Sequence, residues 1–213
     1  LFDLDGAIVH TAQDLMSAHN HVMKKFGHPT KELGDVKSLA GKGAWLMMQR
    51  SLKKEVTDEK IKNEMTKDFI DYYSKNIAND SRPFDGLFSF LDWAKSKNIS
   101  MAVCTNKQER LAVDLLKRLN LFNYFEYVAG SDTFNYNKPD PRHLTDVVEI
   151  LGGDLKKTLM VGDSEVDEMA ATNAKLPFIL VADGYTEKTV EQIKHDALIK
   201  DYVGFDKIIS KYL

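Results

Sequence analysis

The segment Leu1-Phe2-Asp3-Leu4-Asp5-Gly6 joins a short apolar run to two acidic residues and a glycine. Similar apolar runs recur at residues 101–104, 127–129, 159–161 and 178–181, and stretches of helical periodicity separate them. Short, fully apolar strands that alternate with helices are typical of a parallel sheet covered on both faces. The sequence therefore predicts an α/β fold with a doubly wound parallel sheet.

A different pattern lies between the first expected strand and the others. From residue 11 to about residue 79, apolar side chains recur at helical spacing, with no convincing strand. One expected helix ends at Gly27, a second follows Gly41-Lys42-Gly43, and a third covers residues 58–76. We therefore expect a core domain of residues 1–10 and 82–213, with an all-helical cap domain of residues 11–81 inserted into it.

The composition argues against several classes of protein. The 213 residues carry a formal net charge of -3, so no global basic field attracts nucleic acid. Cys104 is the single cysteine, which excludes an internal disulfide framework and favours a reducing compartment. No segment reaches the roughly 20 apolar residues of a membrane helix. We expect a cytoplasmic protein that binds neither nucleic acid nor membrane, and we expect a few residues to precede Leu1.

Polar residues follow the expected strands. In an open parallel sheet, ligands bind at the carboxyl ends of the strands, so these residues are candidates for a site. They are Asp3 and Asp5 after the first strand, Thr105 and Asn106 after the second, Lys138 after the third, and Asp163 with Asp167 after the fourth.

The acidic residues among them favour a bound cation. Asp3 and Asp5 are two positions apart and would project to the same side of an extended chain, and Asp163 adds a third carboxylate. Such carboxylates repel one another unless a cation intervenes, and Mg²⁺ prefers oxygen ligands together with substrate phosphate. Thr105 can donate to phosphate oxygens and Lys138 supplies positive charge. The set predicts magnesium-dependent phosphoryl transfer.

Four motifs carry a resemblance to a known family. They read Asp3-Leu4-Asp5-Gly6-Ala7-Ile8-Val9, Cys104-Thr105-Asn106-Lys107, Lys138-Pro139-Asp140-Pro141 and Val161-Gly162-Asp163-Ser164-Glu165-Val166-Asp167. In this order they resemble the haloacid dehalogenase-like superfamily, in the branch with an α-helical cap that includes phosphoglycolate phosphatase. The resemblance implies a Rossmann-like core, a magnesium cofactor and a small phosphorylated metabolite as substrate.

The resemblance also implies a role for each site residue. Asp3 would be the nucleophile that forms an aspartyl-phosphate, and Asp5 the general acid and base. Thr105 and the Asn106 amide would hold the phosphoryl group, and Lys138 would neutralise it. Mg²⁺ would be bound by Asp3, Asp163 and the backbone carbonyl of Asp5. Asp167 would orient a metal-bound water or Lys138.

Within the expected cap, Gly41-Lys42-Gly43 resembles the substrate loop of phosphoglycolate phosphatases. Amides at a helix N-terminus favour an anion, which suits the carboxylate of 2-phosphoglycolate. Lys42 is an even choice between a contact to this anion and a solvated side chain. The hinges between core and cap are expected between Gly6 and His10 and around Pro83 and Gly86.

Two positions depart from the family pattern. Ala7 stands where threonine is commonest, and His10 stands where an aspartate is usual. Neither change removes a named catalytic group. We therefore expect these departures to alter rate or specificity without abolishing activity.

Taken singly, the same residues have simpler interpretations. Asp3 and Asp5 could be turn residues, Thr105 a helix N-cap, Lys138 a surface lysine, and Asp167 a partner of a helix dipole. Their joint order favours a site.

The leading hypothesis is hydrolysis of a small phosphomonoester, with 2-phosphoglycolate first. The alternatives are a phosphosugar mutase of the β-phosphoglucomutase type and, from another class, a non-catalytic binding or regulatory protein on the same fold. Either a monomer or a homodimer is expected.

Overall fold

The computed structural model describes residues 1–41, 43–52 and 58–212, and a parallel sheet forms its centre. Phe2 makes parallel bridges to Val103 and to Val161, so the opening segment occupies the central position in the sheet, between β3 (Ala102–Cys104) and β5 (Met160–Gly162). On one side lie β3 and β4 (Tyr127–Ala129), and on the other lie β5, β6 (Phe178–Val181) and β7 (Ala197–Ile199). All these pairings are parallel, which confirms the predicted sheet.

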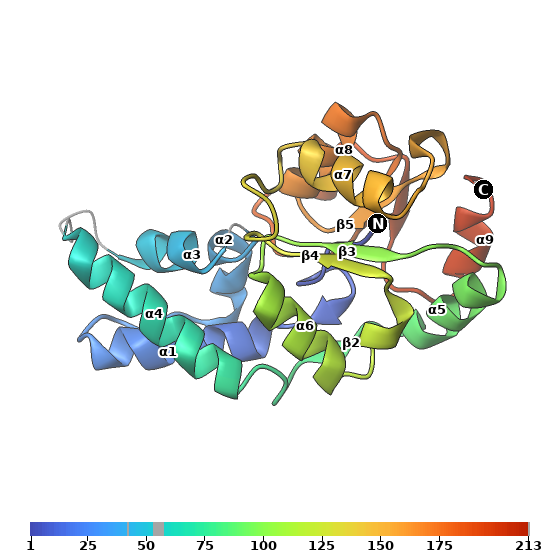
Figure 1. Ribbon diagram of the computed structural model, residues 1–213. Coiled ribbons are helices and arrows are strands. Elements are labelled where there is room, and N and C mark those ends of the chain that lie inside the picture. The colour runs from blue at the N-terminus through green and yellow to red at the C-terminus, as the bar shows by residue number, and fades with distance from the viewer. Residues whose placement is uncertain (42, 53–57, 213) are drawn as a thin grey trace.

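Both faces of the sheet are covered, as Figure 1 shows. Val103 and Ile179 belong to one buried cluster, whereas Ala102 and Phe178, their neighbours along the strands, belong to another. This division follows from the alternation of side chains along a strand. Helices α5 (Leu87–Ser96), α6 (Glu109–Arg118) and α9 (Phe205–Ile209) pack on the first face, and α7 (Arg142–Ile150) and α8 (Glu165–Ala174) pack on the second.

A group of helices extends from one end of the sheet (Figure 1). It contains α1 (Ala12–Lys25), α2 (Val36–Leu39), α3 (Ala44–Ser51) and α4 (Glu59–Lys75). Helix α4 begins where the Asp58 carboxylate accepts a hydrogen bond from the N–H of Lys60. Its residues Met65, Phe69 and Tyr73 are four positions apart and fully buried, so they form the stripe that packs in this helical group.

The chain crosses between the helical group and the sheet at a short antiparallel ribbon. Strand β1 (Val9–His10) pairs with β2 (Arg82–Pro83), with Val9 opposite Pro83. The domain boundaries expected from the sequence fall at this ribbon. The division of the chain into core and cap at these residues stays a prediction.

The sequence-based elements differ from the structure in a few places. Helix ends shift by one or two residues, and β1, β2, α2, β7 and α9 were not expected. Short 3₁₀ helices also connect elements at Leu33–Asp35, Phe122–Tyr124, Leu155–Lys157 and Val190–Gln192. Lys138 follows the third expected strand, as predicted, and lies in the loop between β4 and α7. In the described part of the chain, no helix combines the length and hydropathy required to span a bilayer.

Candidate active site

A cavity of about 300 Å³ lies between the carboxyl ends of the strands and the helical group. The sheet side contributes Asp3, Asp5, Thr105, Asn106 and Lys107. The helical side contributes mainly apolar and glycine residues, among them Gly41, Gly43, Trp45, Phe69 and Tyr73. Four of the predicted site residues therefore line one cavity, namely Asp3, Asp5, Thr105 and Asn106. The two described glycines of the predicted substrate loop, Gly41 and Gly43, line the same cavity.

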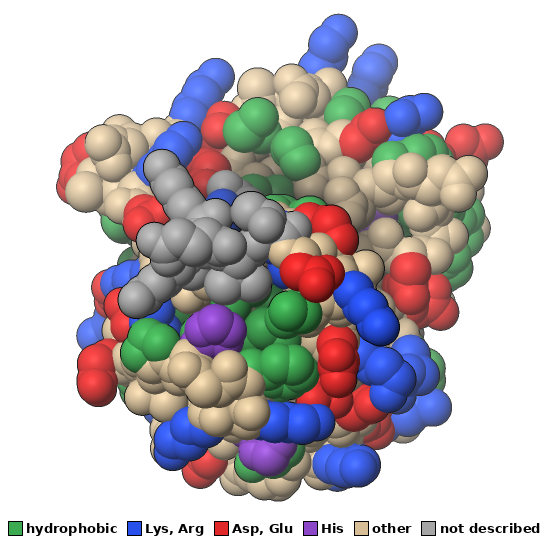
Figure 2. All heavy atoms as spheres, turned by 90° about the vertical axis from the view of Figure 1, so that its left-hand side faces the viewer, with side chains coloured by type: hydrophobic (Ala, Val, Ile, Leu, Met, Phe, Trp, Pro, Cys, Tyr) green, Lys and Arg blue, Asp and Glu red, His purple; other side chains and the backbone are tan. Residues whose placement is uncertain are grey.

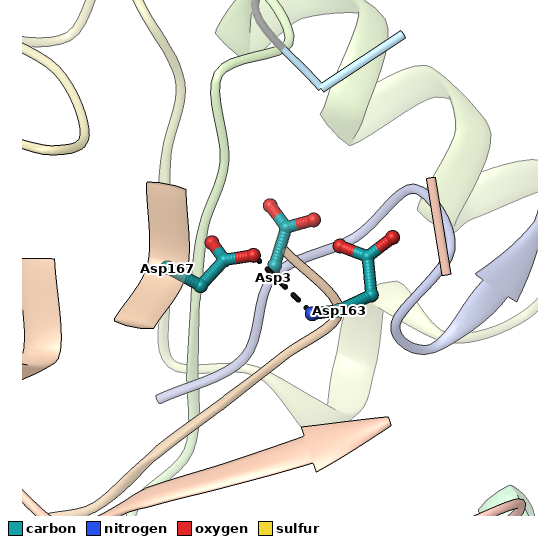
Figure 3. Close-up of side chains that lie close together, drawn as sticks. All are labelled: Asp3, Asp163 and Asp167. Carbon is teal, nitrogen blue, oxygen red and sulfur yellow. Dashed lines mark hydrogen bonds between the residues drawn. The ribbon is translucent and has the colours of Figure 1, made fainter. Parts of the chain in front are cut away.

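Three buried carboxylates gather beside this cavity (Figure 3). Asp3, Asp163 and Asp167 each offer an oxygen, and these oxygens lie within 4.8 Å of one another. Asp3 follows the central strand position, Asp163 follows β5, and Asp167 is in the first turn of α8. The sheet therefore brings residues 160 positions apart into one cluster, as the sequence predicted for Asp3 and Asp163.

Lys138 joins two of these carboxylates. Its Nζ donates to Oδ1 of Asp3 and to Oδ1 of Asp167, at 2.6 Å each. Oδ2 of Asp167 accepts from the Ser164 hydroxyl at 2.7 Å and from the N–H groups of Ser164 and Asp163. Because both oxygens of Asp167 already have partners, this residue is suited to orienting Lys138.

Burial disfavours the charged forms of the acids. Desolvation, with the nearby Asp167 and Asp5, raises the pKa of Asp3 to about 6 against the opposing effect of Lys138. Desolvation followed by Asp167 and Asp3 raises the pKa of Asp163 well above its ordinary value. Burial opposes the charge of Lys138, but Asp167 and Asp3 together raise its pKa. Ionisation of all three acids would place more negative charge in the cluster than one lysine neutralises.

The donor set fits a hard divalent cation. Among the described residues, Oδ2 of Asp3 and Oδ1 of Asp163 accept no hydrogen bond, whereas the other oxygen of each is held by Lys138 or by the N–H of Tyr185. A divalent cation would satisfy these two oxygens and relieve their repulsion. The chemistry of buried carboxylate oxygens with little competing nitrogen or sulfur is that of magnesium sites.

Glycines allow the backbone to approach this cluster. A Cβ on Gly184 would lie 2.3 Å from the Cβ of Asp163, and one on Gly6 would lie 2.3 Å from Oδ2 of Asp163. Gly6 also has φ +81°, a conformation that other residues rarely adopt. The position of Asp163 therefore depends on the absence of side chains at both places.

Asp5 has a partner that the sequence analysis did not name. Nζ of Lys107 donates to both carboxylate oxygens of Asp5 at 2.8 Å and lies 4.6 Å from the ring centroid of Tyr73 on α4. Lys107 follows Asn106 directly in the second motif, so its place after a strand was the available signal. In the sequence alone, Lys107 could not be distinguished from an ordinary surface lysine.

Thr105 and Asn106 lie where the sequence predicted them. Thr105 is buried, and its Oγ1 accepts from the N–H of Lys107 at 3.2 Å. The side-chain amide of Asn106 donates to the carbonyl of Lys138 at 3.0 Å and to that of Gly41 at 3.4 Å. Asn106 therefore contacts both the loop of Lys138 and the predicted substrate loop. Lys42 lies outside the described residues.

The two departures from the family pattern occupy different surroundings. Ala7 is fully buried, and its carbonyl accepts from the Tyr202 hydroxyl at 3.1 Å. His10 stacks on Phe84, with ring centroids 3.6 Å apart, at the ribbon between sheet and helical group. The expectation that they alter rate or specificity stays a prediction.

Comparisons with known proteins agree with this geometry. The haloacid dehalogenase-like hydrolase family matches the chain over residues 1–181. The chain belongs to this family. Its curated relatives identify it as a phosphatase within this family, and it resembles the phosphoglycolate phosphatases in particular, as the sequence motifs indicated.

Named relatives support that placement within the haloacid dehalogenase-like hydrolases. A phosphoglycolate phosphatase of Agrobacterium fabrum is 38% identical over 218 residues, with 99% of this chain and 94% of that protein covered. One from Caulobacter vibrioides is 36% identical, with 97% and 88% covered. A crystal structure of a predicted phosphoglycolate phosphatase from Haemophilus somnus superposes with a TM-score of 0.92 at 27% identity, covering 97% of this chain and 95% of that one.

Proposed function

We propose that this phosphatase hydrolyses a small phosphomonoester through an aspartyl-phosphate on Asp3, with Mg²⁺ as cofactor. The observation that carries the proposal is the convergence of Asp3, Asp163 and Asp167 with Lys138 beside a cavity that also contains Asp5. The Asp3 carboxylate attacks phosphorus, the bond to the leaving alkoxide breaks, and water later cleaves the aspartyl-phosphate. Splitting the displacement in this way replaces one hard step by two easier ones.

The other side chains have separate tasks in this scheme. Asp5 gives a proton to the leaving oxygen and later takes one from the attacking water. Thr105 and the Asn106 amide hold phosphate oxygens, and the Lys138 ammonium offsets the charge that develops on them. Asp167 holds Lys138 in place through the 2.6 Å contact.

Asp3 and Asp163, with the backbone carbonyl of Asp5, would hold the Mg²⁺. When bound there, the ion would supply positive charge for the phosphate oxygens. This assignment is supported by the two carboxylate oxygens that lack hydrogen-bond partners among the described residues.

The proposed substrate is 2-phosphoglycolate. Support comes from relatives named phosphoglycolate phosphatase and from the small cavity of about 300 Å³. The helical group would exclude bulk water when it covers the phosphate.

The cytoplasmic location, the monomeric or homodimeric state, and the absence of nucleic-acid and membrane partners stay predictions. Figure 2, which looks onto the helical end, shows acidic and basic side chains intermixed on that face.

Phosphate release from p-nitrophenyl phosphate and from 2-phosphoglycolate tests the proposal. We expect release that requires Mg²⁺ and is lost on chelation, and a decrease of at least about a thousandfold in Asp3→Asn. Asp71→Asn, which changes an exposed carboxylate on α4, is the matched control and should keep parental activity. Equal activity in Asp3→Asn and the parent would exclude the aspartyl-phosphate.

The mutase alternative shares the roles of Asp3 and Asp5. It differs in the acceptor of the phosphoryl group, which is a sugar phosphate and not water. Incubation with a phosphosugar and its bisphosphate separates the two functions, because a mutase yields the isomeric phosphosugar and a hydrolase yields inorganic phosphate. We expect inorganic phosphate.

A further inference from the structure

Lys107 and Tyr73 both line the cavity, and the two side chains contact each other. Lys107 comes from the loop after β3, and Tyr73 comes from the last turns of α4. The Lys107 ammonium lies 4.6 Å from the centroid of the Tyr73 ring. Both side chains are buried, with 6% of the Lys107 side chain exposed and 1% of Tyr73 exposed.

The hydroxyl of Tyr73 is buried without a hydrogen-bond partner in the described part of the chain. A buried hydroxyl without a partner costs free energy, so such groups in a cavity wall are often satisfied by a ligand. The hydroxyl of a tyrosine donates readily to an anion. Tyr73, whose ring lies 4.6 Å from the Lys107 ammonium, therefore carries an unused donor in the cavity wall.

The rest of the cavity wall on the helical side has no charged side chain among its described residues. Its described members include Trp45, Leu46, Met47, Phe69 and Ile70, which are apolar. Among the described lining residues, Lys107 is the one cation. An anionic group on a substrate would therefore find its charge partner at Lys107.

The distance from the reacting atoms also suits Lys107. As general acid, Asp5 comes within about 3 Å of the oxygen that joins phosphorus to the leaving group. Lys107 lies 2.8 Å from the Asp5 oxygens, so it lies near the first atoms beyond that bridging oxygen. In 2-phosphoglycolate the carboxylate carbon is only two bonds from the bridging oxygen, which places its charge within reach of Lys107.

We propose that Lys107 and Tyr73 bind the carboxylate of the leaving group and so select phosphate esters of 2-hydroxy carboxylic acids. The proposal rests on the phosphatase function proposed above and assigns specificity to residues outside the Gly41-Lys42-Gly43 loop. On binding, the Lys107 ammonium is shared between Asp5 and the substrate carboxylate, and the Tyr73 hydroxyl gains an acceptor. Neither residue takes part in bond making or breaking.

Two substrates of equal length test the proposal. They are 2-phosphoglycolate and 2-hydroxyethyl phosphate, in which a neutral CH₂OH replaces the carboxylate. The quantity to measure is the ratio of kcat/KM for the first to kcat/KM for the second. This ratio cancels any general effect of a variant on Asp5, on folding or on phosphate binding.

In Lys107→Met we expect the ratio to fall about tenfold to a hundredfold, because the carboxylate loses a charged partner. In Tyr73→Phe, which removes one oxygen and keeps the ring, we expect a fall of about threefold to tenfold. The matched controls are Lys67→Met and Tyr72→Phe, both on α4, the helix that carries Tyr73. Both should retain the parental ratio. If Lys107→Met does not fold, Tyr73→Phe decides.

An unchanged ratio in the folded variants would overturn the proposal, since Lys107 would then act only on Asp5. A parent that hydrolyses 2-hydroxyethyl phosphate as well as 2-phosphoglycolate would overturn it too, and both results leave the phosphatase function intact. A parent without magnesium-dependent hydrolysis of any phosphomonoester would instead contradict the proposed function itself.

Discussion

The Nζ atom of Lys138 lies 2.6 Å from Oδ1 of Asp3, although the two residues are 135 positions apart in the chain. The same ammonium contacts Asp167 at 2.6 Å, and all three side chains are buried. A buried ammonium with two carboxylate partners is well compensated, whereas the carboxylates without it are not. Lys138 therefore stabilises the fold and fixes the orientation of Asp3 at once.

Lys138→Met should reveal the first of these effects in the metal-free protein. It leaves Asp3 and Asp167 buried without their cation, so we expect the free energy of unfolding to fall by about 3–5 kcal/mol. Urea denaturation followed by circular dichroism measures it. Lys67→Met removes an exposed ion pair to Asp71 on α4 and should change the unfolding curve little. An unaltered midpoint in Lys138→Met would contradict the compensation described above.

The raised pKa of Asp3 predicts a pH dependence of stability in the metal-free protein. The pKa is about 6 in the folded protein and 3.8 for a free aspartate side chain, so the folded state binds the extra proton between these values. The contribution of Asp3 to stability is therefore complete below about pH 4 and is lost as the pH rises through 6. Asp3→Asn has no such group. We expect the unfolding free energy of the parent minus that of the variant to decrease between about pH 4 and pH 6. A difference that does not change with pH would refute the raised pKa of Asp3.

Gly184→Ala should weaken the response to Mg²⁺. Its Cβ would lie 2.3 Å from the Cβ of Asp163 and 2.6 Å from the Asp163 backbone oxygen, so that carboxylate must move. We expect the magnesium concentration for half-maximal activity to rise about tenfold or more, as when the support of a metal ligand is lost. Gly34→Ala is the control, because a Cβ there meets nothing within 4 Å. Identical magnesium titrations for the two variants would count against a metal role for Asp163.

Much of the fold could be predicted because its strands are buried on both faces. Runs such as residues 178–181 are apolar at every position, and the structure has β6 at these residues. The ribbon of β1 and β2 was missed because each strand is two residues long, too short for any periodicity. Strand β7 was missed because it has one buried residue, Ile199.

The candidate site divides in the same way. The proximity of Asp3 and Asp163 could be predicted, because the carboxyl ends of parallel strands meet at one edge of the sheet. The pairing of Asp5 with Lys107, and the approach of Tyr73, depend on how the helical group sits over the sheet. No local pattern in the sequence encodes that placement, because Tyr73 shares its helical stripe with ordinary core residues such as Phe69.

Asp14 gives the final prediction, at the point where the chain returns from the helices to the sheet. Its buried carboxylate accepts from the hydroxyl of Ser81 at 2.6 Å, from the N–H of Ser81 at 2.8 Å and from the N–H of Asp80 at 3.1 Å. Asp14→Ala leaves these donors without an acceptor, so we expect unfolding to become about 2–4 kcal/mol easier. Ser81→Ala removes one donor and keeps the carboxylate bonded, so it should cost less. Urea titrations that rank Ser81→Ala below Asp14→Ala in stability would show that the carboxylate does not hold this crossing.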